Sequence, residues 1–377
     1  MSGTFSPATP RRRVLVVDDS TFKRIALRRI IESSSEMTVV GEARNGREAV
    51  ELARDLKPDI ITMDVEMPEL DGLGAMKLII AERRPAPIMI MVSGHTQRGT
   101  EATIKALSLG AVDFVSKSSP FAAEDLGHVD SELKEKLRYW ASQPAPLPIR
   151  QPANPASPRV PAAAPIAARP VLRAKSPRGQ VDLVVVACST GGPQMLAGFL
   201  AGAAPLGAPM IVAQHMPAMF TTSLANLLRS DTGLDVREGA HRMALPPGSV
   251  TIIPGGGDGI VARATAGFEL RLTTHESLVH PCADLLFETA AMVARHPVAV
   301  IMTGMGNDGT KGAQQFLRRR LPVLVQDPKT CVVSGMPTAA IDAGVATEVL
   351  TPAGIGQKLV LWTGASYTPR ADLVETP

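Results

Sequence analysis

The sequence has few of the residues that build disulfide frameworks and metal clusters. Its 377 residues include only three cysteines, Cys188, Cys282 and Cys331, which form no CxxC pair. A disulfide scaffold is therefore excluded, and the C-terminal half offers no cluster with the usual zinc-ligand spacing. Scarce, scattered cysteine is typical of a reducing compartment, so we expect the protein in the cytoplasm.

Long apolar runs and a strong charge of one sign are also missing. No stretch reaches the roughly 18 uncharged apolar residues that a membrane span requires. Residues 1–10, which precede three arginines, contain no apolar signal-peptide core. The formal net charge is +3, from 39 basic and 36 acidic residues. These features predict no membrane insertion and give no ground for a nucleic-acid-binding face.

One segment of unusual composition divides the chain. Residues 141–180 contain ten prolines, ten alanines, six basic residues and no acidic residue. Proline at this density prevents regular helices and sheet ladders, so we expect a semi-extended tether. The predicted organisation is a flexible N-terminus (1–11), a first domain (12–140), the Pro/Ala-rich linker (141–180), a second domain (181–365) and a flexible tail (366–377).

Both domains show alternating strand and helix patterns. Short β-branched, apolar runs are separated by longer amphipathic segments such as Gly46–Leu56. This alternation predicts a parallel sheet with helices on both faces in each domain. The expected strands are Val14–Val17, Thr38–Val40, Ile60–Met63, Ile88–Val92 and Asp113–Val115, then Leu183–Ala187, Met210–Ala213, Val250–Ile253, Val298–Met302 and Val323–Val325. In such sheets functional side chains collect at the carboxyl ends of strands.

In the first domain, polar residues follow four of these strands. Asp18, Asp19 and Asp64 come directly after two strands, and clustered carboxylates favour an oxygen-binding cation such as Mg²⁺. Ser93 and Lys117 follow two later strands and suit a phosphoryl group bound beside that cation. A single aspartate after a strand is commonly only a helix cap, but five such residues at successive strand ends favour a site.

These residues resemble the response-regulator receiver family, through VVDDS (16–20), DVEMPELDG (64–72), Ser93 and Lys117. The resemblance implies a flavodoxin-like (βα)5 fold and phosphorylation of Asp64 by a histidine kinase, with Asp18 and Asp19 serving Mg²⁺. It also implies that Ser93 and Phe114 form the switch pair and that Lys117 contacts the phosphoryl group. Ser118 departs from the family, in which proline usually follows this lysine.

In the second domain, a serine, a histidine and an aspartate follow three strands. Ser189 lies in CSTGGP after one strand, His215 follows another, and Asp308 lies in a glycine-rich stretch after a third. A hydroxyl needs a base to become a nucleophile, and an imidazole base needs a carboxylate to fix its tautomer. The three residues together therefore predict a catalytic triad.

Other interpretations of the same residues exist. The CSTGGP turn also suits a phosphate cradle, and Ser189 suits a helix N-cap. His215 alone suits a surface role, and Asp308 before glycine suits a plain turn. Cys188 is a possible nucleophile, but no C-x5-R loop follows it, which favours a buried structural cysteine.

The second domain resembles the CheB-type protein-glutamate methylesterase family. The matching stretches are CSTGGP (188–193), QHMP (214–217), HPCADLLF (280–287), MTGMGNDG (302–309) and QDPKTCVVSGMP (326–337). The resemblance implies a doubly wound, parallel-sheet α/β hydrolytic domain, with Ser189 as nucleophile, His215 as base and Asp308 as its orienting acid. We expect Thr190 and the backbone N–H of Met305 to bind the oxyanion. The family commonly has serine at Cys282 and a histidine in the stretch 254–259, and this chain has neither.

The expected function is phosphorylation-activated hydrolysis of glutamate γ-methyl esters on methyl-accepting chemoreceptors, with deamidation of selected glutamines. The resemblance implies a CheA-type histidine kinase as phosphodonor, Mg²⁺ in the receiver and no cofactor for ester hydrolysis. Two alternatives are a phosphorelay module without catalysis and a receiver-linked transcription factor. The intact triad argues against the first, and the α/β pattern with little basic character argues against the second.

Overall fold

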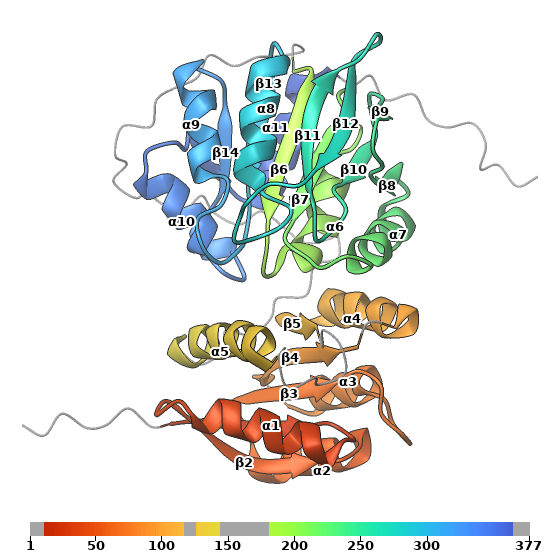
Figure 1. Cartoon of the computed structure of the whole chain (residues 1–377), viewed down its shortest axis with the longest axis vertical. Helices are drawn as coiled ribbons and strands as arrows, with labels where there is room; N and C mark the ends of the chain where they lie inside the picture. The colour runs from red at the N-terminus through yellow and green to blue at the C-terminus, as the bar shows by residue number, and fades with distance from the viewer. Residues whose placement is uncertain (1–10, 84, 95, 117–125, 144–180, 365–377) are drawn as a thin grey trace, which may run out of the picture. The chain divides into compact units, whose positions relative to one another are not determined.

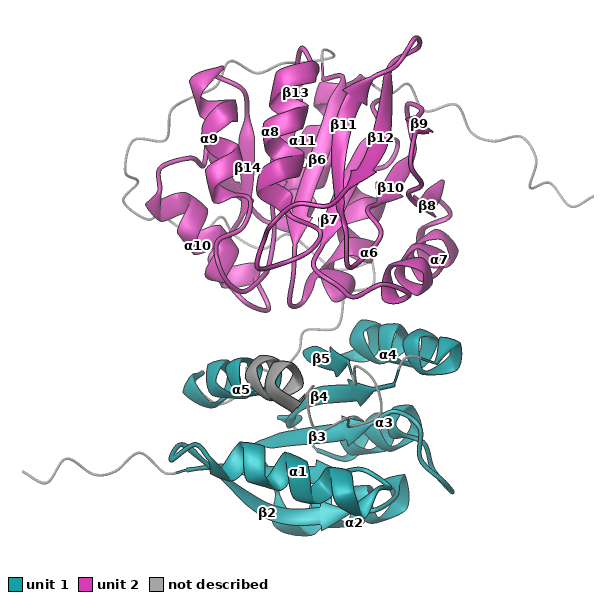
Figure 2. Ribbon diagram, viewed as in Figure 1, with its two compact units in different colours: residues 1–158 teal, residues 159–377 magenta. Residues whose placement is uncertain are grey.

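The computed structural model describes residues 11–83, 85–94, 96–116, 126–143 and 181–364. The chain divides into two compact units, residues 1–158 and 159–377 (Figure 2). Residues 1–10, 144–180 and 365–377, which include most of the predicted N-terminal segment and linker and the whole predicted tail, lie outside the described residues, so the proposed domain boundaries stay a prediction. Among the described residues, no helix is both long and apolar enough to cross a membrane.

Unit 1 contains one five-stranded parallel sheet with strand order β2-β1-β3-β4-β5 (Figure 1). Its elements alternate strictly along the chain: β1 (Arg12–Val17), α1 (Thr21–Glu32), β2 (Met37–Ala43), α2 (Gly46–Leu56), β3 (Ile60–Asp64), α3 (Gly72–Glu82), β4 (Ile88–Ser93), α4 (Gln97–Leu109), β5 (Asp113–Ser116) and α5 (Leu126–Ser142). The predicted (βα)5 fold is thus confirmed.

Short polar residues start several helices of unit 1. Asn45 caps α2 by accepting from Glu48 N at 2.9 Å, and Asp71 caps α3 by accepting from Gly74 N at 2.7 Å. Thr96 caps α4 in the same way, through Gly99 N at 2.9 Å. Each cap thus ends the loop that leaves the carboxyl end of the preceding strand.

Unit 2 contains a seven-stranded parallel sheet with strand order β15-β14-β13-β6-β7-β10-β8. Its elements are β6 (Leu183–Cys188), α6 (Gly192–Gly202), β7 (Met210–Gln214), α7 (Phe220–Thr232), β8 (Val236–Glu238), β9 (Met243–Leu245), β10 (Val250–Ile252), β11 (Asp258–Arg263), β12 (Phe268–Thr273), α8 (Ala283–Val293), β13 (Pro297–Ile301), α9 (Thr310–Arg318), β14 (Val323–Gln326), the 3-10 turn η1 (Pro328–Thr330), α10 (Gly335–Asp342), β15 (Glu348–Leu350) and α11 (Pro352–Thr363).

The central strands of unit 2 are buried on both faces. Every residue of β6, β7 and β13 is buried, and alternate residues such as Leu183, Val185 and Ala187 join a core with α8, α9 and α10 on one face. Helices α6, α7 and α11 pack together, and α6 and α11 cover the other face (Figure 1). This is the predicted doubly wound sheet. Strands β7, β10 and β8 lie on one side of the β6–β13 pair, and β14 and β15 lie on the other side.

A second, antiparallel sheet was not predicted. Strands β11, β12 and β9 form a three-stranded sheet in the order β11-β12-β9, and β11 lies against α8. Residues 268–273 alternate between apolar and polar side chains, as a half-buried antiparallel strand does, but residues 258–263 do not. Asp258 is the first residue of β11 in this sheet.

Candidate functional site

The three predicted triad residues lie at the carboxyl ends of three neighbouring strands. Ser189 follows β6, His215 follows β7, and Asp308 lies in the loop after β13. Strand β6 pairs with β7 on one side and with β13 on the other. The junction of β6 and β13 is where the two halves of the sheet diverge, which is the usual position of a binding site in this architecture.

The turn that carries Ser189 is held by backbone contacts on two sides. Ser189 N donates to Thr303 O at 3.0 Å, and Gly192 N donates to Ser189 O at 2.8 Å. Gly191 has φ +79°, and a Cβ there would lie 2.4 Å from Val332 Cβ, so the position requires glycine. The serine follows its strand on a tight strand-to-helix turn, as a nucleophile elbow does.

His215 is fixed beside that turn. His215 N donates to Cys188 O at 3.0 Å, and the Gln214 side chain donates to Ser189 O at 2.9 Å. The His215 Nε2 atom lies 2.8 Å from Asp308 Oδ2, and each of these side chains is 10% exposed. The structure thus pairs the predicted base with the predicted acid and holds the backbone of the base against the nucleophile turn.

Asp308 is surrounded by hydrogen-bond donors. Its carboxylate accepts from Ala283 N at 2.7 Å, Asp284 N at 2.9 Å and Gly309 N at 2.9 Å, in addition to His215. Burial acts to raise the pKa of Asp308, but His215 and the backbone N–H groups at the start of α8 outweigh it and lower that pKa. Asp308 is therefore held as a carboxylate, the form that can orient and stabilise an imidazolium.

Cys188 is the structural cysteine that the sequence favoured. It is fully buried, its Sγ donates to Gln214 Oε1 at 3.1 Å, and burial raises the pKa of its thiol. A thiol that stays protonated at neutral pH is a poor nucleophile. Cys282 is also buried, and its Sγ lies 3.8 Å from Asp308 Oδ1, beside the site rather than in the position of a nucleophile.

Thr303 connects the serine turn to the loop that carries Asp308. Its buried Oγ1 lies 3.0 Å from both Thr190 O and Val333 O, and it accepts from Val333 N at 2.9 Å. The Thr303 hydroxyl therefore connects the loops that follow β6, β13 and β14.

We expect Thr303→Val to lower the free energy of unfolding of the protein by about 1–3 kcal/mol, because it leaves buried backbone groups without a partner. Urea unfolding of the purified protein measures this change. Thr347→Val would serve as a comparison, since Thr347 Oγ1 makes similar buried contacts with Val323 far from the serine turn. If both variants lose the same stability but only Thr303→Val loses activity, then the Thr303 hydroxyl is part of the functional site.

The residues expected to bind the oxyanion lie in the same region. Thr190 is 7% exposed and follows Ser189 directly. Gly304 lies against the serine, since a Cβ at position 304 would be 2.8 Å from Ser189 Cβ. Met305 is the next residue of that loop. The oxyanion roles of Thr190 and of the Met305 N–H stay predictions.

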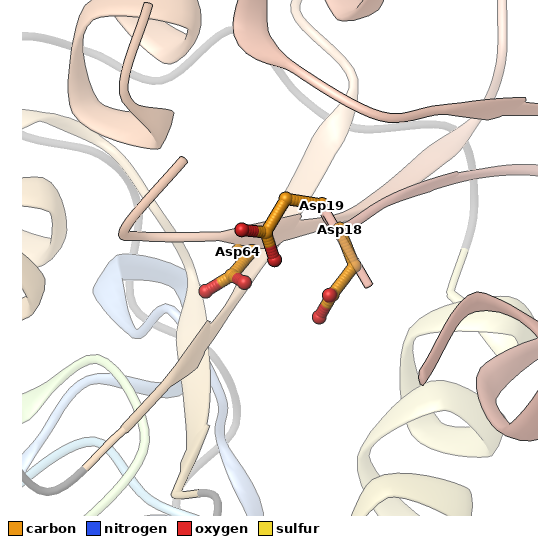
Figure 3. A group of neighbouring side chains, drawn as sticks. All are labelled: Asp18, Asp19 and Asp64. Carbon is orange, nitrogen blue, oxygen red and sulfur yellow. The ribbon is translucent and has the colours of Figure 1, made fainter. Parts of the chain in front are cut away.

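In unit 1, the acidic residues predicted as a cation site do meet. One oxygen of each of Asp18, Asp19 and Asp64 lies within 4.8 Å of the others, and Figure 3 shows the three side chains gathered at one edge of the sheet. Asp18 and Asp64 are buried, and Asp19 is exposed. Three carboxylates with one side open to solvent suit a hard cation that keeps several waters, so the cluster is consistent with a Mg²⁺ site.

The predicted switch residues occupy neighbouring strands. Asp64 ends β3, and Ser93, fully buried, ends β4 beside it. Phe114 on β5 is 6% exposed, and Lys136 Nζ lies 5.3 Å from its ring centroid. Lys117 lies outside the described residues, so its predicted contact with the phosphoryl group stays a prediction.

Comparison with known proteins gives a match for each of the two units. Residues 184–359 match the CheB methylesterase family, and residues 14–128 match the response regulator receiver domain. A protein-glutamate methylesterase/protein-glutamine glutaminase of Thermotoga maritima is 41% identical over 352 residues, covering 92% of this chain and 97% of the relative. The chain belongs to the CheB methylesterase family.

Two further CheB-family relatives match over nearly the full length. One from Symbiobacterium thermophilum is 40% identical and covers 90% of this chain and 93% of the relative. One from Syntrophomonas wolfei is 37% identical and covers 93% of this chain and 99% of the relative. Each is named a protein-glutamate methylesterase/protein-glutamine glutaminase. Both family resemblances predicted from the sequence are confirmed.

Some participants in the site were not predicted as such. The N–H groups of Ala283 and Asp284 bind Asp308, and Thr303 joins three loops, yet neither feature has a chemical signature in the sequence. Backbone donors are independent of side-chain identity, so only the fold shows which ones reach a carboxylate. Asp258 lies in the stretch 254–259, and nothing in its local sequence marked it as part of the site.

Proposed function

We propose that this CheB-family chain hydrolyses glutamate γ-methyl esters through a Ser189–His215–Asp308 triad. The observation that carries the proposal is the 2.8 Å pairing of His215 Nε2 with Asp308 Oδ2, held directly beside the Ser189 turn. Paired with a carboxylate, Nε2 keeps its proton, and the lone pair of the imidazole is then on Nδ1. Nδ1 is therefore the atom that takes the proton of Ser189.

The reaction proceeds as acyl transfer. Ser189 Oγ attacks the γ-carbonyl carbon of the ester while His215 Nδ1 takes the hydroxyl proton. The tetrahedral intermediate places negative charge on the carbonyl oxygen, which Thr190 and the Met305 N–H stabilise. The intermediate collapses, the methoxy oxygen accepts the proton from His215, and methanol leaves a glutamyl ester on Ser189. Asp308 stabilises the imidazolium that exists between these two proton transfers.

Water completes the cycle. His215 takes a proton from water, the resulting hydroxide attacks the glutamyl ester, and Ser189 leaves with the proton returned by His215. The products are a free γ-carboxylate and the original enzyme. A glutamine side chain enters the same sequence with ammonia as the leaving group, which accounts for deamidation by the same triad. The substrates that we propose are the methylated side chains of methyl-accepting chemoreceptors.

Unit 1 controls this activity in our proposal. Asp18, Asp19 and Asp64 would hold Mg²⁺, which neutralises charge on an incoming phosphoryl group. Asp64 Oδ attacks the phosphorus of a phosphodonor, such as the phosphohistidine of a CheA-type kinase, and becomes an aspartyl phosphate. The N–P bond of the donor breaks, and the kinase histidine leaves as a free imidazole. Ser93 and Phe114 lie on the next two strands of the sheet. They respond to the added negative charge on Asp64 and so change the surface of the receiver.

Asp64→Asn should leave basal methanol release intact and abolish its increase on addition of acetyl phosphate and Mg²⁺, because an amide cannot accept the phosphoryl group. The measurement is methanol released from methylated receptor membranes with and without the donor. Asp59→Asn is the matched control, since Asp59 precedes the same strand at its opposite end and binds Arg13 N at 2.8 Å. A phosphodonor response that persists in Asp64→Asn would contradict the assignment of Asp64.

A further inference from the structure

We propose that Asp258 is a positioning residue for the triad. It fixes the segment 275–284, which contacts the backbone beside His215 and the carboxylate of Asp308. This inference deepens the proposed hydrolysis and rests on it. Asp258 does not touch the reacting atoms in this account, and it acts through the segment that it binds.

Asp258 is a buried carboxylate with three donors from one segment. It begins β11 and is 1% exposed. Its carboxylate accepts from Cys282 N at 2.7 Å, from His275 N at 3.0 Å and from His280 Nδ1 at 3.0 Å. A buried carboxylate is costly unless its oxygens are occupied, and here all of these donors come from residues 275–282. Asp258 therefore holds the segment 275–284 at its first residue, His275, and near its end, at Cys282.

The same segment supports both the base and the acid of the triad. His280 O accepts from Met216 N at 3.3 Å, and Met216 directly follows His215. Ala283 N and Asp284 N donate to Asp308 at 2.7 and 2.9 Å. A displacement of residues 280–284 would thus move the backbone next to His215 and remove donors from Asp308 together.

Two carboxylates share the start of one helix. The first N–H groups of a helix have no partner within it, and they attract negative charge. At α8 the N–H of the capping residue Cys282 binds Asp258, and the next two N–H groups bind Asp308. Asp258 therefore sets where the helix begins, and the helix start sets the position of Asp308. The Asp258–His280 contact adds a second attachment two residues earlier.

Asp258→Asn tests this role, because asparagine keeps the volume but replaces one accepting oxygen with a donor that opposes the N–H groups. We expect kcat for methanol release to fall about 10–100-fold, the cost of a displacement of about 1 Å in a catalytic constellation, with KM within about twofold. Asp182→Asn is the matched control. Asp182 binds Arg295 N and His296 N at the opposite end of α8 and should leave kcat unchanged.

A double-mutant cycle separates positioning from a purely structural effect. If Asp258 acts through the His215–Asp308 pair, then Asp258→Asn should change kcat by less than about threefold in a His215→Ala background, because the base that it positions is already lost. An equal fold-change in both backgrounds would overturn the proposal. So would a kcat of folded Asp258→Asn within about threefold of the wild-type value.

Hydrogen exchange gives a readout that needs no substrate. The backbone amides of residues 275–284 should exchange faster in Asp258→Asn than in the wild-type protein or in Asp182→Asn, and unchanged exchange would overturn the proposal. If Asp258→Asn does not fold, His280→Ala removes one donor and keeps the carboxylate, and its kcat should fall about 3–10-fold. A wild-type chain that releases no methanol would refute the proposed function, while exchange would still test the attachment of this segment.

Discussion

Replacement of Ser189 by alanine is expected to lower kcat for methanol release by about 10³–10⁶-fold, the range found when a triad nucleophile is removed. The alanine side chain has no oxygen to form the glutamyl ester, so acyl transfer through the enzyme stops. The methyl group fits the turn, because the backbone contacts that hold it use Ser189 N and Ser189 O rather than the hydroxyl. The fold and the phosphodonor chemistry of unit 1 should be unchanged.

The neighbouring thiol provides the control for this experiment. Cys188→Ala should keep most of the wild-type kcat, because the buried thiol stays protonated and donates only to Gln214. It should lower the melting temperature slightly through the lost packing. If Cys188→Ala were inactive while Ser189→Ala retained turnover, the cysteine would be the nucleophile and our mechanism would be wrong.

Asp308→Asn is expected to lower kcat by about 10³–10⁴-fold with a small change in KM. The amide loses the negative charge that stabilises the imidazolium. It can also present its NH₂ group to His215 Nε2, which would then accept and leave the proton on Nδ1. In that tautomer His215 has no lone pair facing the serine, so the defect is in proton transfer rather than in binding.

The matched control for Asp308 lies at the same edge of the sheet. Asp327 follows β14 and accepts from Lys329 N at 3.0 Å. Asp327→Asn should therefore retain nearly all activity. Steady-state rates of methanol release, with circular dichroism to confirm folding, measure both variants. A kcat for Asp308→Asn within about tenfold of wild type would show that the carboxylate does not orient the base.

The sequence predicted the parts of the fold that depend on local pattern. The runs Ile60–Met63 and Leu183–Ala187 are strands because they are short, apolar and β-branched, and in the structure each ends one residue later than predicted. The helix at Gly46–Leu56 has the predicted bounds, since Asn45 caps its start and Lys57 ends it in a left-handed conformation. Polar and ionisable side chains directly after the predicted strands then indicated both the acidic site of the first domain and the triad of the second.

What the sequence did not predict depends on contacts between distant segments. The three-stranded antiparallel sheet joins residues 243–245 to two strands later in the chain, and its short strands give weak periodicity. Asp258 lies among glycines and suits a turn by local criteria. Its contacts with Cys282, 24 residues away, exist only because β11 packs against α8. The choice of Nε2 rather than Nδ1 for Asp308 likewise follows from loop geometry.

Methanol release from methylated chemoreceptor membranes by the wild-type chain, with and without acetyl phosphate and Mg²⁺, decides whether unit 2 is a receptor methylesterase under the control of unit 1. We expect release without the phosphodonor and faster release with it, and both should disappear in Ser189→Ala. No release from several receptor types, under conditions in which Asp64 is shown to be phosphorylated, would contradict the account and leave unit 2 as a hydrolase for a different ester.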